Sequence, residues 1–349
     1  MPTVGVDQHE LTTWFANHVD EVGELDLTMV EGGHSCLTYL IRTVDGAAPA
    51  GGPRWVLRRP PLGHVLPTAH DVLREHRIIT ALAPTDVPVP SAVGACDDVD
   101  VIGAPFYVMD FVGGVVLHDR AASATLVPEA RRAAGFSMVD VMVALHAVDI
   151  DEVGLGELAR PRPYVERQLR RWHGQWEKSD LRDLTGMVDL RDWLTENMPE
   201  EAKPGIVHGD FRLGNAIHRP DGTVAALLDW ELCSTGPAGA DLSYLLRSWT
   251  DPARAAGRAD EPAREVPSDL EGFPTRDELV ERYEQGSGTT MDDLDYWMAF
   301  HAWRSACIAA GVYTRYRSGQ MGEQSNDLDR LRQGVIDGLA DGKRLAGIP

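Results

Sequence analysis

Along the first 112 residues, apolar and polar positions alternate in short patterns that fit a small α/β lobe. Residues 8–22 and 70–82 show the spacing of amphipathic helices. Five runs dense in β-branched and apolar side chains predict strands, at 25–30, 35–42, 53–59, 91–96 and 105–112. We therefore expect a five-stranded lobe with one helix inserted after its third strand.

From about Gly113 the periodicity changes to long helical patterns. They predict helices at 128–148, 162–177, 187–198, 238–249, 276–286, 291–317 and 324–341. Two short strand-like runs, 215–219 and 224–230, are joined by the turn sequence RPDGT and predict a hairpin. Residues 251–273 are rich in proline, alanine and charge and are expected to form a loop or insertion. The fold class is α+β and bilobal, with lobes at 1–112 and 113–349.

Composition and charge limit the kinds of partner and the location expected for this chain. It has 349 residues, 43% hydrophobic, enough to bury a core in two lobes. The formal net charge of −21 is spread along the chain and disfavours nucleic acid or an anionic membrane as a partner. Four widely spaced cysteines, no export-type N-terminus and no run of 18 apolar residues predict a cytoplasmic protein with free thiols.

The stretch IVHGDFRLGN at 206–215 concentrates candidate chemistry. Asp210 follows an apolar strand, where its carboxylate can take a proton from a hydroxyl. Asn215 lies five residues on, and Asp229 ends the returning strand of the hairpin, so both can hold a hard cation near Asp210. Phosphoryl transfer needs this combination. The alternative is that Asp210 and Asn215 only shape a turn.

HGDFRLGN followed by LLDWE resembles the catalytic and metal-binding segments of the aminoglycoside phosphotransferase family. These are small-molecule kinases that share the protein kinase fold. The resemblance implies that Asp210 is the catalytic residue and that Asn215 and Asp229 hold Mg²⁺. The protein-kinase motifs H-R-D, D-F-G and A-P-E are absent, which disfavours a protein kinase.

In the first lobe, the segment EGGHSCLTYLIR resembles the family's nucleotide loop. The resemblance implies that Gly32, Gly33 and Ser35 approach the phosphates of ATP or GTP, since glycines let backbone N–H groups come close. A plain hairpin turn is the alternative. Cys36 departs from the family pattern, because close relatives show asparagine there.

Arg58, in the strand WVLRR, stands where kinases place the lysine that holds the α- and β-phosphates. The lobe contains no lysine, and Glu75 of the following helix is the expected partner of Arg58. A solvated Arg58 and Glu75 are the alternative. VLRRPP resembles a branch of the family in which arginine takes this place.

The strand at 105–112 ends where kinases join their two lobes. Its final backbone groups are expected to bond an adenine edge, and they belong to Asp110, Phe111 and Val112.

Two other features of the second lobe have a structural and a functional interpretation. Asp241, near the start of the 238–249 helix, is either an N-terminal cap or a support for the catalytic loop. The aromatic residues of the 291–317 helix are expected in the core rather than against a substrate.

These features predict an ATP- and Mg²⁺-dependent phosphotransferase that acts on a hydroxyl of a small molecule. The VLRRPP branch resembles domains associated with acyl-CoA dehydrogenases, which implies such an association and ranks a hydroxyacyl-CoA or other metabolic alcohol above an aminoglycoside. One alternative is a nucleotide-binding pseudo-enzyme, suggested by Cys36 and the missing lysine. Another is a metal-dependent hydrolase that uses His208, Asp210 and His218.

Overall fold

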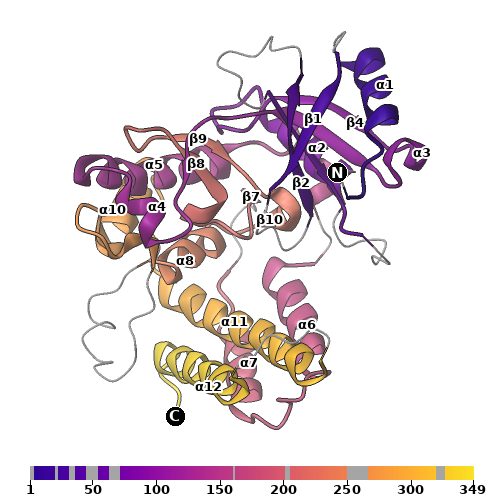
Figure 1. Ribbon diagram of the computed structural model, residues 1–349. Coiled ribbons are helices and arrows are strands. Elements are labelled where there is room, and N and C mark those ends of the chain that lie inside the picture. Colours follow the sequence, from indigo (N-terminus) through magenta and orange to yellow (C-terminus); the bar gives the residue numbers. More distant parts are fainter. Residues whose placement is uncertain are drawn as a thin grey trace.

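A computed structural model describes residues 4–19, 23–30, 36–44, 54–62, 71–159, 162–200, 205–249, 266–319 and 327–349. The chain forms a sheet-based first lobe and a mainly helical second lobe, as the periodicity predicts (Figure 1). The nucleotide-loop residues Gly32, Gly33 and Ser35 lie outside the described residues, as does 251–265 of the predicted loop.

The first lobe is an antiparallel sheet in the order β1-β2-β3-β5-β4. Its elements are β1 (Leu25–Met29), β2 (Leu37–Thr43), β3 (Trp55–Arg59), β4 (Ala92–Cys96) and β5 (Phe106–Asp110), with helices α1 (Gln8–His18), α2 (Val72–Leu82) and α3 (Val99–Ile102). The five strands and the helix inserted after β3 match the prediction. The four-residue α3 was not predicted, because it is too short to show a helical period.

The two faces of this sheet bury different side chains. Leu57 of β3 packs in a cluster with Trp14 and Phe15 of α1, which covers one face. Val56 belongs instead to the core that continues into the second lobe. This alternation places Arg58, two residues beyond Val56, on the face that looks toward α2 and the second lobe.

The second lobe places three small β pairings at the junction of the lobes and helices around them (Figure 1). The strands are β6 (Val115–Val116), β7 (Gly205–Val207), β8 (Ala216–His218), β9 (Val224–Leu227) and β10 (Ser234–Gly236). The helices are α4 (Arg120–Ala124), α5 (Pro128–Ala147), α6 (Tyr164–Trp176), α7 (Gly186–Glu196), α8 (Gly239–Arg247), α10 (Arg276–Ser287), α11 (Leu294–Arg317) and α12 (Leu328–Leu345), with short 3₁₀ turns η2 (Gly156–Leu158), η3 (Leu213–Asn215), η4 (Trp230–Leu232) and η5 (Pro267–Asp269).

The main differences from the predicted elements lie at their ends and in the shortest pieces. The helix expected at 324–341 runs four residues further, and the one expected from 291 begins at Leu294. Part of the loop expected at 251–273 contains η5. The aromatic residues of α11 are core residues as predicted, with Trp297, Phe300 and Trp303 fully buried against α6, α7 and α12. No described helix is long and apolar enough to cross a membrane.

Candidate active site

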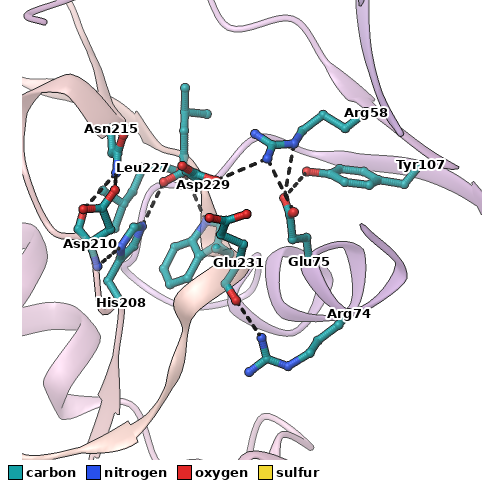
Figure 2. Close-up of polar contacts among 12 residues, drawn as sticks. Arg58, Arg74, Glu75, Tyr107, His208, Asp210, Asn215, Leu227, Asp229 and Glu231 are labelled. Atoms are coloured by element: carbon teal, nitrogen blue, oxygen red, sulfur yellow. Dashed lines mark hydrogen bonds and ion pairs between the residues drawn. The ribbon is translucent and has the colours of Figure 1, made fainter. Parts of the chain in front are cut away.

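The loop that carries Asp210, the residue expected to be catalytic, is called the catalytic loop below. It begins just after β7, at Gly209, which no other residue can replace without strain. Gly209 has φ +84°, and a Cβ there would lie 2.7 Å from the carbonyl oxygen of Leu232. Both the left-handed backbone and the close approach require glycine. The bend turns the chain so that Asp210 leaves the strand toward the β8–β9 hairpin (Figure 2).

Asp241 holds this bend from α8. Its carboxylate accepts hydrogen bonds from the backbone N–H of His208 (2.6 Å) and of Gly209 (2.8 Å), and it is fully buried. Burial acts to raise the pKa of Asp241, but the hydrogen bonds from His146 and from the backbone N–H of Gly209 act against it, and the pKa is lowered. Of the two interpretations of Asp241, the structure favours the support of the loop, because the N-cap of α8 is Ala238 and has no side-chain hydrogen bond.

His208 connects the catalytic loop to the segment before Asp229. Its Nδ1 accepts a hydrogen bond from the backbone N–H of Asp210 (3.2 Å), and its Nε2 lies 2.8 Å from the carbonyl oxygen of Leu228. The tautomer with the proton on Nε2 satisfies both contacts. His208 is therefore occupied as a bridge between the two loops.

Asp210 and Asn215 lie against each other (Figure 2). The Asn215 Nδ2 donates to the carboxylate Oδ2 of Asp210 (2.7 Å) and to its backbone carbonyl (2.8 Å). Arg212 adds a contact of 3.4 Å to the same carboxylate oxygen. The Asn215 Nδ2 orients the Asp210 carboxylate, and the Asn215 Oδ1 is left for another ligand.

Asp229 stands next to this pair at the end of β9. The backbone N–H of Leu228 donates to the carbonyl of Asn215 (2.8 Å), so the ends of β8 and β9 that carry Asn215 and Asp229 are directly joined. Asp229 is the one non-glycine residue with positive φ (67°) among the described residues, a conformation that costs about 1 kcal/mol or more. Its carboxylate and the Asn215 amide supply the hard oxygen ligands that suit Mg²⁺.

Arg58 reaches the same place from the first lobe (Figure 2). Its guanidinium makes ion pairs of 3.2 Å with Glu75 of α2 and of 3.2 Å with Asp229. The Arg58 side chain is only 13% exposed, which contradicts the alternative of a solvated arginine. The structure thus pairs Arg58 with Glu75 as expected and adds Asp229 as a second partner.

Glu75 is buried beneath this arginine. The hydroxyl of Tyr107 donates to Glu75 Oε2 (3.2 Å), and the carboxylate is 1% exposed. Burial raises the pKa of Glu75 to about 7, with Arg58 opposing the shift and Asp229 adding to it. The environment therefore makes the charge of Glu75 depend on pH near neutrality.

Cys36, the residue before β2, lies near the buried Arg58 and Glu75. It packs in the core that contains Val56 and Tyr107. Burial, with a smaller contribution from the charge of Glu75, raises the pKa of its thiol to about 12. A protonated, buried thiol adds no charge where nucleotide phosphates are expected.

One contact between the lobes was not predicted. Arg74, which precedes Glu75 on α2, donates to the backbone carbonyl of Glu231 at 3.3 Å (Figure 2). It also donates to the carbonyl of Cys233, in the same segment after Asp229. Adjacent residues of α2 therefore fix both Arg58 and the backbone after Asp229. The sequence offers no signal for this bond, because backbone acceptors leave no pattern.

The segment that joins the lobes uses part of its hydrogen-bonding capacity internally. The N–H of Asp110 donates to Ser91 (2.9 Å) and that of Phe111 to Arg54 (2.9 Å). Among the described residues the N–H of Val112 has no partner. Of the three expected adenine contacts, the donor at Val112 is the one that is open.

The hydrolase alternative finds little support in the described part of the chain. His218 is fully buried, and its Nδ1 lies 3.0 Å from the carbonyl of Gly222 across the β8–β9 turn. Both ring nitrogens of His208 are used in contacts with the backbone of Asp210 and Leu228. Within the described ranges, no three His, Cys, Asp or Glu side chains are grouped as a metal site.

The two lobes, with Asp210, Asn215 and Asp229 at their junction, define the kinase-like class of small-molecule phosphotransferases. Residues 26–297 match the phosphotransferase enzyme family, APH, and the chain belongs to this family. The predicted resemblance and bilobal fold are confirmed.

Solved structures and curated proteins agree with this assignment. A crystal structure from Ralstonia eutropha, of a protein assigned to the aminoglycoside phosphotransferases, is 31% identical, with a TM-score of 0.77 over 97% of this chain and 98% of its own. The GDP complex of aminoglycoside 2'-phosphotransferase-IIIa shares the fold at 15% identity, with a TM-score of 0.61 over 96% of this chain and 99% of its own.

The curated relatives are longer proteins. Acyl-CoA dehydrogenase family member 11 of Gallus gallus is 33% identical over 93% of this chain and 41% of its own length. Acyl-CoA dehydrogenase family member 10 of Mus musculus is 34% identical over 85% of this chain and 27% of its own length. The chain therefore spans less than half of the curated relatives that it matches.

Proposed function

We propose that this protein transfers the γ-phosphate of ATP or GTP to a hydroxyl of a small molecule, with Mg²⁺ as cofactor. The observation that carries the proposal is the convergence of Asp210 and Asn215 on the hairpin end that bears Asp229, with Arg58 reaching Asp229 from the first lobe. A base, two oxygen ligands for a cation and a phosphate-binding arginine are the parts that phosphoryl transfer requires.

Each part has a separate task in this mechanism. Asp210 orients the acceptor hydroxyl and takes its proton as the new O–P bond forms and the bond from the γ-phosphorus to the β-phosphate oxygen breaks. Asn215 keeps the Asp210 carboxylate in one orientation through the 2.7 Å bond and, with Asp229, offers oxygens to the metal. Bound Mg²⁺ neutralises charge on the transferring phosphate.

Arg58 has to exchange partners when nucleotide binds. Its pair with Glu75 keeps the guanidinium at the inner face of β3, and its 3.2 Å contact with Asp229 is the one that phosphate and metal would replace. Arginine binds phosphate oxygens through a rigid fork of donors, so it can take the place of the usual lysine.

For the acceptor, we favour a hydroxyacyl-CoA or another metabolic alcohol over an aminoglycoside. The curated relatives carry the name acyl-CoA dehydrogenase and match this chain over 27–41% of their length, so this chain corresponds to one part of them. Functional association with an acyl-CoA dehydrogenase is part of this proposal. A structural neighbour is described in complex with streptomycin and ATP, but at 14% identity it supports the fold alone.

A nucleotide-binding pseudo-enzyme is the second candidate. The observations that favour it are the buried, neutral Cys36 and the Arg58–Asp229 ion pair, which occupies a ligand of the expected metal. It predicts nucleotide binding without transfer to any acceptor.

Asp210→Ala separates the two candidates. If the protein is a kinase, this variant loses at least about 1000-fold of its turnover, because the base is removed, while it binds Mg²⁺-nucleotide as the wild type does. Asp221→Ala, which removes an exposed carboxylate from the turn of the same hairpin, is the matched control and keeps its activity. Turnover of Asp210→Ala at the wild-type rate contradicts the assignment of Asp210, and a wild type that binds nucleotide without transfer supports the pseudo-enzyme.

A further inference from the structure

Arg304 of α11 is a buried cation for which the mechanism above has no use. It is 4% exposed, and its Nη1 and Nη2 both lie 3.3 Å from the carbonyl oxygen of Gly209. Among the described residues no carboxylate forms an ion pair with Arg304, and its Nε has no hydrogen-bond partner. Burial of a charge without an acidic partner is costly, so Arg304 needs another source of stabilisation.

Two aromatic rings supply part of that stabilisation. The guanidinium carbon of Arg304 lies 5.3 Å from the ring centroid of Trp172 on α6 and 5.4 Å from that of Tyr244 on α8. Both distances are within the range of a cation–π contact. Arg304 is therefore held by two neighbouring helices while its donors point at the catalytic loop.

The two peptide units that meet at Gly209 are consequently both held. Asp241 accepts from the N–H of Gly209 at 2.8 Å in the unit between His208 and Gly209, and Arg304 donates to the Gly209 carbonyl in the unit between Gly209 and Asp210. Because the left-handed Gly209 sets the direction of the chain into Asp210, a rotation of this unit would move the carboxylate. In the unit between Gly209 and Asp210, the N–H of Asp210 donates to His208 Nδ1, and Arg304 holds the carbonyl on the opposite side.

We propose that Arg304 is a positioning residue for Asp210, because it holds the Gly209 carbonyl in the peptide unit that leads into Asp210. The proposal rests on the proposed function, since it assigns this residue to the same phosphoryl transfer. It also ties the catalytic loop to α6 and α11, two helices of the second lobe whose packing against each other would then affect turnover.

Arg304→Met tests the proposal, with Arg59→Met as a matched control. Arg59 is also 4% exposed and also donates to backbone carbonyls, including that of Ile102 (3.0 Å), but it lies in the first lobe away from the loop. Turnover is measured as ADP release from Mg²⁺-ATP, alone and with a panel of hydroxyacyl-CoA and aminoglycoside acceptors, and binding of Mg²⁺-ADP is measured by calorimetry.

We expect Arg304→Met to lower kcat by about 10- to 100-fold, because small displacements of a reacting group have effects of this size, with nucleotide affinity unchanged within about 2-fold. Arg304→Lys, which keeps the charge and can still donate to the carbonyl, restores part of kcat. Arg59→Met loses thermal stability but keeps kcat. Equal kcat in Arg304→Met and Arg59→Met overturns the proposal.

A further measurement keeps the test decisive if Arg304→Met fails to fold or the wild type shows no turnover. Hydrogen exchange of the 206–215 segment needs no activity: it should be faster in Arg304→Lys than in the wild type and unchanged in Arg59→Met. Unchanged exchange in Arg304→Lys overturns the inference, whereas absent nucleotide binding by the wild type overturns the proposed function.

Discussion

Asp241→Asn is the substitution that most directly tests how the catalytic loop is held. The Asp241 carboxylate accepts two backbone N–H bonds at 2.6 and 2.8 Å and is fully buried. Hydrogen bonds to a charged group contribute about 1.5–3 kcal/mol each. Asparagine has one oxygen, so one bond remains and an NH₂ group faces the other N–H donor. We expect a loss of about 2–4 kcal/mol in the free energy of unfolding.

Denaturant unfolding of Asp241→Asn beside Asp229→Asn measures this loss. Asp229 is 27% exposed and accepts no buried backbone bond, and asparagine tolerates its left-handed backbone, so Asp229→Asn should lose less than about 1 kcal/mol. Both variants should lose activity, Asp241→Asn because the loop shifts and Asp229→Asn because a metal ligand is weakened. An Asp241→Asn protein as stable as the wild type would refute the account of the loop.

Two other predictions follow from the site. Gly209→Ala should lose at least about 2 kcal/mol of stability and most of its turnover, because its Cβ would meet the Leu232 carbonyl. Gly103→Ala is the control: Gly103 has φ +80° with open space around it, so this variant should lose about 1 kcal/mol and keep its activity. Thermal unfolding and ADP release measure the two effects. The pKa of Glu75 is raised from 4.5 to about 7 by burial, so its contribution to stability is fully present below pH 4.5 and lost as the pH rises through 7. Between pH 4.5 and 8 the free energy of unfolding should therefore fall by up to about 3 kcal/mol relative to Glu75→Gln, and parallel pH profiles of the two proteins would contradict the buried, proton-binding Glu75.

The larger elements and the chemical motifs of this protein could be predicted from the sequence, because each has a local sequence pattern. Period-2 and period-3.6 patterns mark β1 to β5 and the long helices, and HGDFRLGN with LLDWE marks the two loops that carry Asp210, Asn215 and Asp229. The strand β6 and the helices α3 and α4 were missed, because β6 has two residues and neither helix is long enough to show a helical period.

The supports of the site depend on contacts between distant parts of the chain. Arg74 bonds carbonyls more than 150 residues away, and Arg304 reaches the carbonyl of Gly209 from a helix 95 residues further on. Because backbone acceptors have no side-chain signature, neither arginine could be singled out from the sequence. Asp241 was identified, but only the 2.6 and 2.8 Å bonds decide between a helix cap and a loop support.

Calorimetric titration of ATP and GTP, with and without Mg²⁺, tests the central claim most directly, because it examines the shared site before any acceptor is known. The account predicts binding that depends on Mg²⁺ and is lost in Asp229→Ala, which removes the carboxylate joined to Arg58. Failure of the wild type to bind either nucleotide, or binding that neither Mg²⁺ nor Asp229→Ala affects, would contradict it.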